Sequence, residues 1–381
     1  MTATHLSALT LAQFRSHALT RLSIDARPVA LFGANGAGKT NLLEAVSLLS
    51  PGRGLRRARP EELARAPGAL GWRARATLAG RGDPVEVALT GPPEGGRRVE
   101  IDGRAAPQTA LGALVPMLWL TPAMDRLFIE GAEGRRRGID RAALGFEPAH
   151  AEAAQAYDRA MRERSLLLRD GPRDARWLDA LEARMAEAGA AVARARATTA
   201  ARLNAAQEGG AALFPTAQAA MVGKMEARFA AAGPAGAEAS EIMEEFRISL
   251  ARGRRDDAAA GRALAGPHRS DLAVVYAEKE MDARLCSTGE QKALLIGLTL
   301  AAARAMAADR GTAPILLLDE VAAHLDAARR AALYDALCEL GAQSWLSATE
   351  PGLFAGLGDR AQGFEVTEGP DGSTVRAAAL A

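Results

Sequence analysis

The chain reads Val29-Ala30-Leu31-Phe32-Gly33-Ala34-Asn35-Gly36-Ala37-Gly38-Lys39-Thr40 near its N-terminal end. From Gly33 onward this stretch fits the pattern G-x-x-x-x-G-K-[ST] at every position, and a compact apolar run precedes it, as in a buried strand. The glycines let the backbone curl so that its N–H groups converge on an anion, and the helix expected from about Lys39 directs its positive end at that anion. The stretch therefore predicts a phosphate-binding loop between a strand and a helix, and with it an α/β fold.

The residue types of this loop suit a nucleoside triphosphate, and we expect ATP. Lys39 is expected to reach the outer phosphates, and the Thr40 hydroxyl to ligate Mg²⁺. The expected ATP contacts in the loop are Gly33, Ala34, Asn35, Gly36, Ala37, Gly38, Lys39 and Thr40.

A second informative stretch reads Ile315-Leu316-Leu317-Leu318-Asp319-Glu320. Four aliphatic residues predict a buried parallel strand, and ligands bind at the carboxyl ends of such strands in open α/β sheets. Asp319 is expected to hold Mg²⁺ through water, and Glu320 to polarise a water for attack on the γ-phosphate. Taken alone, the stretch is equally a core strand that ends in two solvated acids; beside a complete phosphate-binding loop it predicts a hydrolytic site.

A third stretch reads Cys286-Ser287-Thr288-Gly289-Glu290-Gln291-Lys292 and leads into an apolar helix. A serine hydroxyl and glycine N–H groups at a helix start can bind an anion, although the same pattern is also an ordinary helix cap. The order of the three stretches, followed by His324-Leu325-Asp326, resembles the ABC ATPases with their P-loop, signature, acidic strand and D-loop. That resemblance implies a head-to-tail dimer in which the signature meets ATP on the other subunit's P-loop. It adds Ser287, Gly289, Gln291 and Asp326 to the expected ATP contacts.

The chain is long enough for an ATPase head interrupted by an insertion. From Lys39 to Ser287 the distance is 248 residues, far longer than in transporter ATPases, and the plan is similar to that of chromosome-maintenance and double-strand-break-repair ATPases. We expect an ABC-type head built from both chain ends, 1–128 and 263–381, with a helical lobe inserted over 129–262.

Periodicity supports this division of the chain. Residues 72–104 predict a β-meander, and 149–206 predict a helical hairpin with an apolar stripe from Trp177 to Val192. Ser240 is expected to cap a further helix, and strands return at 272–276, 315–318 and 345–348. Stretch 207–240 gives no structural signal.

Smaller motifs resemble the RecF family along nearly the whole chain, from about residue 5 to 350. They begin with Leu11-Ala12-Gln13-Phe14-Arg15-Ser16-His17 and continue with the Asn41-Leu42-Leu43-Glu44-Ala45 extension of the P-loop, which adds Asn41 to the expected ATP contacts. The remaining ones are Thr121–Leu127 with Arg135–Arg141, Arg162–Leu167, and Gly266-Pro267-His268-Arg269-Ser270-Asp271. The resemblance implies a weak, DNA-stimulated ATPase of recombinational gap repair and replication restart. Such a protein dimerises on ATP, binds duplex and gapped DNA, and helps to load recombinase through the mediator protein RecR.

Two departures from the ABC pattern affect the expected site. Glu290 stands where the signature usually has glutamine, and no histidine follows the last head strand. The switch residue that senses the γ-phosphate is therefore expected to be Ser347 or Thr349. Gln108 and Gln155 are both poor candidates for the Q-loop glutamine.

Any DNA contact must come from local patches, since 47 basic residues face 46 acidic ones and the net charge is +1. Candidate phosphate contacts are Arg53, Arg56 and Arg57 with Arg59, then Arg135, Arg136 and Arg137, and then Arg252, Arg254 and Arg255. A solvated charged face explains such clusters equally well. Aromatic residues make up only 4%, so duplex backbone contact is favoured over base stacking.

Two alternative functions remain at this stage. A transport ATPase subunit would have a much shorter spacing between P-loop and signature, and a P-loop small-molecule kinase would have no signature. The two cysteines form no disulfide framework, and neither a signal peptide nor a membrane span is evident. We expect a cytoplasmic protein without membrane contact.

Overall fold

The computed structural model describes residues 4–68, 70–80, 82–92, 95–171, 175–207, 214–233 and 238–380, with the backbone alone at His324. The chain divides into two compact units. The first comprises 1–125, 210–214 and 299–381, and the second comprises 126–209 and 215–298.

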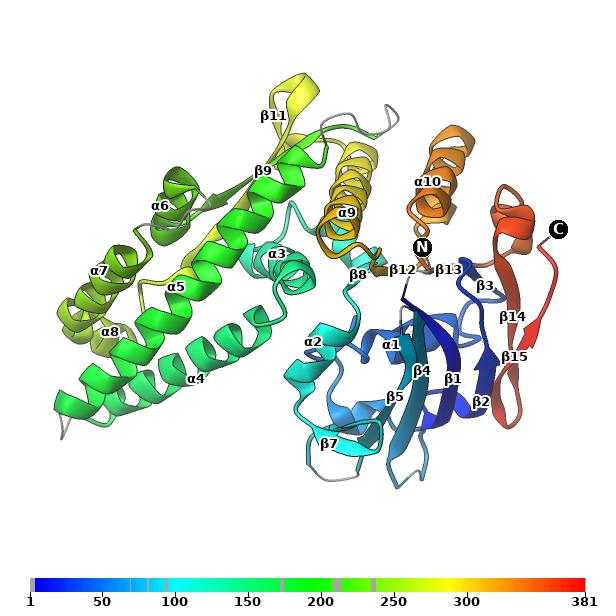
Figure 1. Ribbon diagram of the computed structural model, residues 1–381, viewed down its shortest axis with the longest axis horizontal. Helices are drawn as coiled ribbons and strands as arrows, with labels where there is room; N and C mark the ends of the chain where they lie inside the picture. Colours follow the sequence, from blue (N-terminus) through cyan, green and yellow to red (C-terminus); the bar gives the residue numbers. More distant parts are fainter. Residues whose placement is uncertain are drawn as a thin grey trace. The chain divides into compact units, whose positions relative to one another are not determined.

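The first unit is built on a six-stranded sheet in the order β15-β14-β3-β13-β12-β8 (Figure 1). Five of its strands are parallel, and β15 pairs with β14 antiparallel. The central strands are short aliphatic runs buried along their whole length, as strands covered on both faces must be. The strands are β3 (Val29–Phe32), β8 (Met117–Leu120), β12 (Ile315–Leu318), β13 (Ser344–Ala348), β14 (Gln362–Gly369) and β15 (Gly372–Ala377).

A second, antiparallel sheet of the first unit has the order β2-β1-β4-β5-β6-β7. The P-loop helix α1 (Lys39–Ser47) packs against β1 of this sheet and β13 of the parallel sheet, which explains why most of its side chains are buried. One apolar core joins both sheets. The strands are β1 (His5–Phe14), β2 (His17–Ser23), β4 (Trp72–Gly80), β5 (Gly82–Gly91), β6 (Arg98–Ile101) and β7 (Arg104–Ala106).

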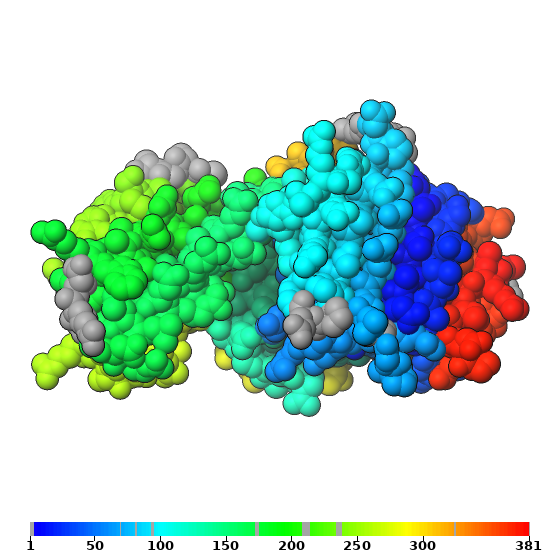
Figure 2. Space-filling view, turned by 90° about the horizontal axis from the view of Figure 1, so that it is seen from below, coloured from blue at the N-terminus to red at the C-terminus, as the bar shows by residue number. Residues whose placement is uncertain are grey.

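Both ends of the chain meet in the first unit. Strand β15 packs against β2, and Figure 2 shows the blue N-terminal segment beside the red C-terminal one. The remaining helices of this unit are α2 (Leu111–Leu114), α10 (Ala327–Glu339) and the C-terminal part of α9 (Thr288–Arg310).

The second unit is mainly helical. Its long helices α4 (His150–Arg169) and α5 (Ala175–Ala205) form an antiparallel hairpin (Figure 1), and α5 packs onto α6 and α7 through a buried cluster that includes Met185 and Ala193. Trp177, the first residue of the expected apolar stripe, is 58% exposed. A small antiparallel sheet of order β11-β10-β9 completes the unit. The other elements are α3 (Ala132–Phe146), β9 (Ala217–Val222), α6 (Lys224–Ala232), α7 (Ala239–Arg252), α8 (Arg254–Ala260), β10 (Asp271–Tyr276) and β11 (Met281–Asp282).

Most of the expected elements are confirmed, one expectation is wrong, and one strand was not predicted. The meander over 72–104, the helical hairpin and the three later strands all form. Ser240 is not a helix cap, because α7 begins one residue earlier and Glu238 takes the N-cap position. Strand β9 lies in the stretch that gave no signal; of that stretch, 208–213 and 234–237 lie outside the described residues.

The unit boundaries differ from the expected ones at the second junction. Residues 263–298 belong to the second unit, because β10 pairs along its whole length with β9 of that unit. The first junction lies at 125/126, close to the expected 128/129. The inclusion of 263–298 in the ATPase head remains a prediction. No helix in the described ranges is long and apolar enough to cross a membrane.

Candidate nucleotide-binding site

The phosphate-binding loop follows β3 and enters α1 through glycines with left-handed backbone. Gly38 has a φ of 111°, and a Cβ there would lie 2.4 Å from Ser373 Oγ and 2.8 Å from Ser16 Oγ. Gly36 has a φ of 85°, and a Cβ there would meet nothing within 4 Å. Only glycine fits the packed position, and the open position leaves the backbone accessible to a ligand.

Lys39 is the first residue of α1, and its side chain folds back over the loop. Its Nζ donates to the carbonyl oxygens of Gly33 at 2.6 Å and Ala34 at 2.8 Å. Burial lowers the pKa of Lys39, while the negative charges of Glu320 and Asp319 act in the opposite direction. The ammonium group is thus held at the loop by neutral carbonyl oxygens, which a phosphate can replace.

The ends of two neighbouring strands converge on the start of α1. Thr40 Oγ1 donates to Asp319 Oδ1 at 3.0 Å, and Ser347 Oγ donates to the same oxygen at 2.6 Å. The backbone N–H of Glu320 donates to Ser347 Oγ at 2.9 Å. Four of the predicted site residues therefore form one hydrogen-bonded cluster: Thr40, Asp319, Glu320 and Ser347.

Ser347 was expected to sense the γ-phosphate, but within this cluster its hydroxyl bonds to the protein. It is only 1% exposed, and its hydroxyl bridges the Asp319 carboxylate and the Glu320 backbone. Glu320 has a φ of 55°, in the left-handed region that is unfavourable for non-glycine residues. The bridge from Ser347 therefore stabilises the turn that directs Glu320. Thr349, the other candidate sensor, lies exposed beyond the end of β13.

The β1–β2 turn braces the loop from the opposite side, which the sequence reasoning missed. Ser16 Oγ accepts hydrogen bonds from Asn41 Nδ2 at 2.8 Å and from Ser373 Oγ at 2.6 Å. The buried His17 ring places Nε2 3.2 Å from the Gly38 carbonyl oxygen, and burial lowers its pKa, so the neutral ring donates this bond. Asn41 was expected to contact ATP, but its amide nitrogen and its amide oxygen both form hydrogen bonds within the protein.

An ion-pair cluster extends this brace toward the first arginine group. Arg15 donates two hydrogen bonds of 2.8 Å to the fully buried Glu44 carboxylate. Arg56 lies 3.8 Å from the same carboxylate and donates to Asn41 Oδ1 at 2.9 Å. The motif at 11–17 could have indicated this brace, but Ser373 gives no local signal.

The signature stretch lies in the second unit, where Ser287 forms a capping box with Glu290. The Ser287 hydroxyl and backbone N–H both donate to Glu290 Oε2 at 2.8 Å. Glu290 also pairs with Lys279, and these hydrogen bonds lower its pKa to about 2. Within a single chain the stretch therefore forms an ordinary helix cap. Ser287 and Gly289 are nevertheless exposed, as a contact with another molecule requires.

Two other expected ATP contacts have structural partners. The Gln291 side chain is 2% exposed, and its Nε2 donates to the Cys286 carbonyl at 2.9 Å, which fixes the entry to α9. Asp326 is the N-cap of α10 and accepts a hydrogen bond of 2.8 Å from the Arg329 backbone. Gln291 is too enclosed for a direct ATP contact in this arrangement, whereas the side chain of Asp326 is exposed.

The second arginine group is not an exposed patch. Arg135 is 7% exposed and forms a bidentate pair with Asp271, with N–O distances of 2.8 and 2.9 Å. Its remaining donors bind the carbonyl oxygens of Leu127, Phe128 and Glu130. Arg136 donates to the Ser270 carbonyl at 2.7 Å. Arg135 therefore lies in the interior of the second unit, where its donors are used within the protein, and a DNA contact of this group remains a prediction.

The other candidate arginines lie nearer the solvent. Arg53 and Arg57 are exposed on the segment that follows α1, and Arg137 is exposed but pairs with Glu133. In the third group Arg254 is tied to Glu182 and Asp179. The segment after α1 is therefore the best-supported candidate for phosphate contact.

The site and fold together define the class of the protein. A phosphate-binding loop, an acidic strand end beside it and a signature-like helix start are the parts of an ABC-type P-loop ATPase. The profile described as RecF/RecN/SMC N terminal domain matches residues 5–368.

Individual relatives identify the family. A DNA replication and repair protein RecF from Mesorhizobium japonicum is 47% identical over 380 residues, covering 97% of this chain and 98% of the relative. A protein of the same description from Caulobacter vibrioides is 49% identical over 381 residues, covering 96% and 97%. The chain belongs to the RecF family of DNA replication and repair proteins.

A solved structure agrees with this fold. It is described as the recombination mediator protein RecF-ATPrS in the RecFOR pathway, and it superposes with a TM-score of 0.81 over 99% of both chains at 21% identity. The expected ABC-type α/β fold is confirmed.

Proposed function

We propose that the chain binds ATP with Mg²⁺, hydrolyses it slowly, and couples this cycle to DNA in recombinational gap repair and replication restart. The observation that carries the proposal is the hydrogen-bonded cluster of Thr40, Asp319, Glu320 and Ser347 at the start of the P-loop helix. Membership of the RecF family supports the DNA-repair role.

The residues present fit a magnesium-bound triphosphate. The Thr40 hydroxyl and the Asp319 carboxylate lie in hydrogen-bond contact, and Mg²⁺ prefers such hard oxygen ligands, with phosphates and waters completing its shell. Such an open, shared site is the type that Mg²⁺ occupies in nucleotide-binding proteins. The left-handed loop around Gly36 leaves room for phosphates on its backbone N–H groups.

Each residue of the cluster has a distinct part in hydrolysis. Lys39 exchanges its carbonyl partners for the outer phosphates and neutralises their charge. Glu320 orients and polarises the attacking water as a general base. Ser347 holds both acidic residues in position through its two hydrogen bonds, and Thr349 remains a candidate contact to the γ-phosphate.

The complete site is proposed to form between two copies of the chain. Ser287 and Gly289 are exposed at the start of α9, and Asp326 exposes its carboxylate at the start of α10. In a head-to-tail dimer these groups would meet ATP on the partner's P-loop. The capping box then gives the exposed helix start a fixed geometry before a partner arrives.

DNA contact is proposed for the segment after α1, through Arg53, Arg56 and Arg57. The tie from Arg56 to Asn41 and Glu44 connects this segment to the P-loop helix, which offers a route for DNA to affect hydrolysis. Duplex and gapped DNA are the proposed substrates, RecR is the proposed mediator partner, and a cytoplasmic location belongs to the same proposal. A transporter subunit is not favoured, because the RecF family match covers nearly the whole chain.

The test is the ATPase rate with and without duplex DNA, together with the molecular mass in ATP. We expect slow hydrolysis, stimulation by duplex and gapped DNA, and a dimer only with ATP. A hydrolysis rate that DNA does not change, together with a monomeric mass in ATP, would contradict the proposal.

A further inference from the structure

A groove of about 400 Å³ lies between α4 and α5 of the second unit. Small side chains from both helices form its floor, so the helix backbones are open to close approach by a third helix. The apolar lining residues are Ala153, Ala156, Ala160, Leu181, Ala188 and Ala191.

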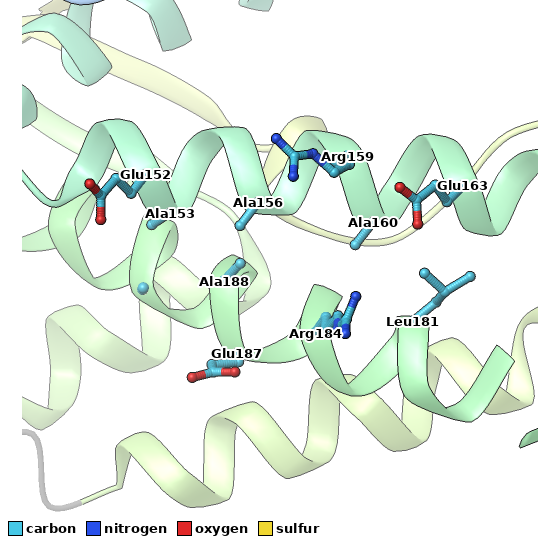
Figure 3. Close-up of a pocket in the computed structure, with 11 residues that line it drawn as sticks. Glu152, Ala153, Ala156, Arg159, Ala160, Glu163, Leu181, Arg184, Glu187 and Ala188 are labelled. Carbon is cyan, nitrogen blue, oxygen red and sulfur yellow. The ribbon is translucent and has the colours of Figure 1, made fainter. Parts of the chain in front are cut away.

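Charged residues on both sides of the groove follow a definite order (Figure 3). Arg159 and Arg184 lie on opposite helices near its middle, Glu152 and Glu187 lie toward one end, and Glu163 lies toward the other. Among the described residues, the structure shows no ion pair or hydrogen bond for the side chains of the two arginines, Glu163 or Glu187. The rim thus presents one positive zone between two negative zones.

Two large apolar side chains continue the groove toward the tip of the hairpin. Trp177 lies four residues before Leu181 on α5, and Leu166 lies three residues after Glu163 on α4, so each is on the groove-facing side of its helix. Trp177 is 58% exposed and Leu166 49% exposed. Exposed tryptophan is a frequent energetic centre of protein–protein interfaces.

The charge order discriminates between possible occupants. A second copy docked about a two-fold axis through the middle would place arginines against arginines and acids against acids. A DNA backbone would meet acids at both ends and exposed apolar groups at the tip. A helix from a different protein avoids both conflicts if its charges complement the rim.

We propose that the α4–α5 groove binds an amphipathic helix of another protein with a specific order of side chains. An apolar residue packs on Trp177 and Leu166, an acidic residue lies between Arg159 and Arg184, and a basic residue lies between Glu152 and Glu187. Small residues of the helix face the alanine floor. The acidic and basic residues are separated by roughly one to two helical turns, or about 5–10 Å at ~1.5 Å per residue.

The test uses a designed peptide and the full-length protein. The probe is an alanine-rich helical peptide with leucines at one end, glutamates at its centre and lysines at the other end. The control peptide has the same composition with glutamates and lysines exchanged. Trp72 and Trp345 are buried and Trp119 is half-buried, whereas Trp177 is 58% exposed. A blue shift that appears in the parent protein but not in a Trp177→Phe variant therefore reports binding at Trp177. We expect the first peptide to bind saturably and the exchanged peptide about tenfold or more weakly, since like charges would face each other.

Matched variants test whether the peptide binds in the groove. Ala156→Arg fills the groove and should abolish binding, whereas Ala183→Arg, exposed on α5 outside the lining, should not. The double variant Arg159→Glu and Arg184→Glu should remove the preference between the peptides, because each peptide then places one charged block against opposite charges and the other against like charges. Both alanine variants should retain parental ATPase activity, so this test is independent of the proposed function.

Three results would overturn the proposal. The first is equal affinity for both peptides, or no saturable binding of either by the parent protein. The second is self-association that Ala156→Arg removes, since a second copy would then be the occupant. The third is a loss of duplex DNA binding in Ala156→Arg but not in Ala183→Arg, because the groove would then serve nucleic acid.

Discussion

Replacing Ser347 by alanine tests whether this residue positions the two acidic groups of the site. The substitution removes the donor to Asp319 Oδ1, at 2.6 Å, and the acceptor for the Glu320 backbone N–H, at 2.9 Å. A hydrogen bond to a charged group contributes ~1.5–3 kcal/mol, and an orphaned buried N–H costs ~1–3 kcal/mol. Both losses act at Asp319 and Glu320, the residues proposed to hold Mg²⁺ and to activate water.

The two losses set the scale of the effect on turnover. If about half of their sum, ~1.3–3 kcal/mol, is felt only in the transition state, kcat falls roughly 10- to 150-fold. ATP affinity should change much less, because Lys39 and the loop backbone remain. Steady-state hydrolysis and equilibrium binding of ATP measure the two quantities separately. Ser347→Thr retains a hydroxyl group and should recover a substantial part of the rate.

A matched control lies on the same strand. Ser344 is also fully buried on β13, and its hydroxyl donates to the Ala342 carbonyl at 3.2 Å, away from the acidic residues. Ser344→Ala should lower the melting temperature without changing kcat beyond about twofold, about 0.4 kcal/mol. The positioning role of Ser347 is refuted if Ser347→Ala and Ser344→Ala hydrolyse ATP at similar rates.

Three further substitutions test other parts of the account. Lys39→Ala should abolish ATP binding, and nucleotide titration showing affinity within twofold of the parent would contradict the P-loop assignment. Glu320→Gln should bind ATP, stop hydrolysis and accumulate an ATP-bound dimer by sedimentation; parental turnover would point to another base. Burial acts to raise the pKa of Asp140, but hydrogen bonds from His150 and Arg196 outweigh it and lower the pKa to about 2. The ionised Asp140 carboxylate therefore stabilises the fold above about pH 4, and this stabilisation is lost as the pH falls toward 2. Asp140→Asn should therefore lower the melting temperature at pH 7 and weaken its acid dependence, and a pH-independent difference would count against this ion pair.

Local patterns predicted the strands that carry the candidate site because the signal lies within a few residues. The P-loop and the strand at 315–318 combine a motif with a continuous aliphatic run, and both form where expected. The strand at 217–222 was missed because three of its six residues are alanine, which favours helix over strand. Its pairing with β10 determines its conformation.

Contacts between distant segments could not be predicted in this way. Ser16 and Ser373 meet beside Gly38 only because β15 packs against β2, and nothing near residue 373 indicates it. Arg135 is different, since it lies four residues before the buried Ile139 on α3 and so shares its face. That periodicity was a usable signal for an interior arginine, although a cluster of three arginines resembles an exposed patch.

If hydrolysis needs a site shared by two copies of the chain, two variants that are inactive alone should complement each other when they are mixed. Lys39→Ala lacks the P-loop cation, and Ser287→Arg places a bulky group at the exposed signature; each should fold, as shown by its melting temperature, and be inactive alone. A head-to-tail dimer of the two has one site with both lesions and one with neither. We predict that mixing restores ATPase activity to below half of the parental rate. No recovery, although hetero-dimers are demonstrated by sedimentation, would contradict the shared site.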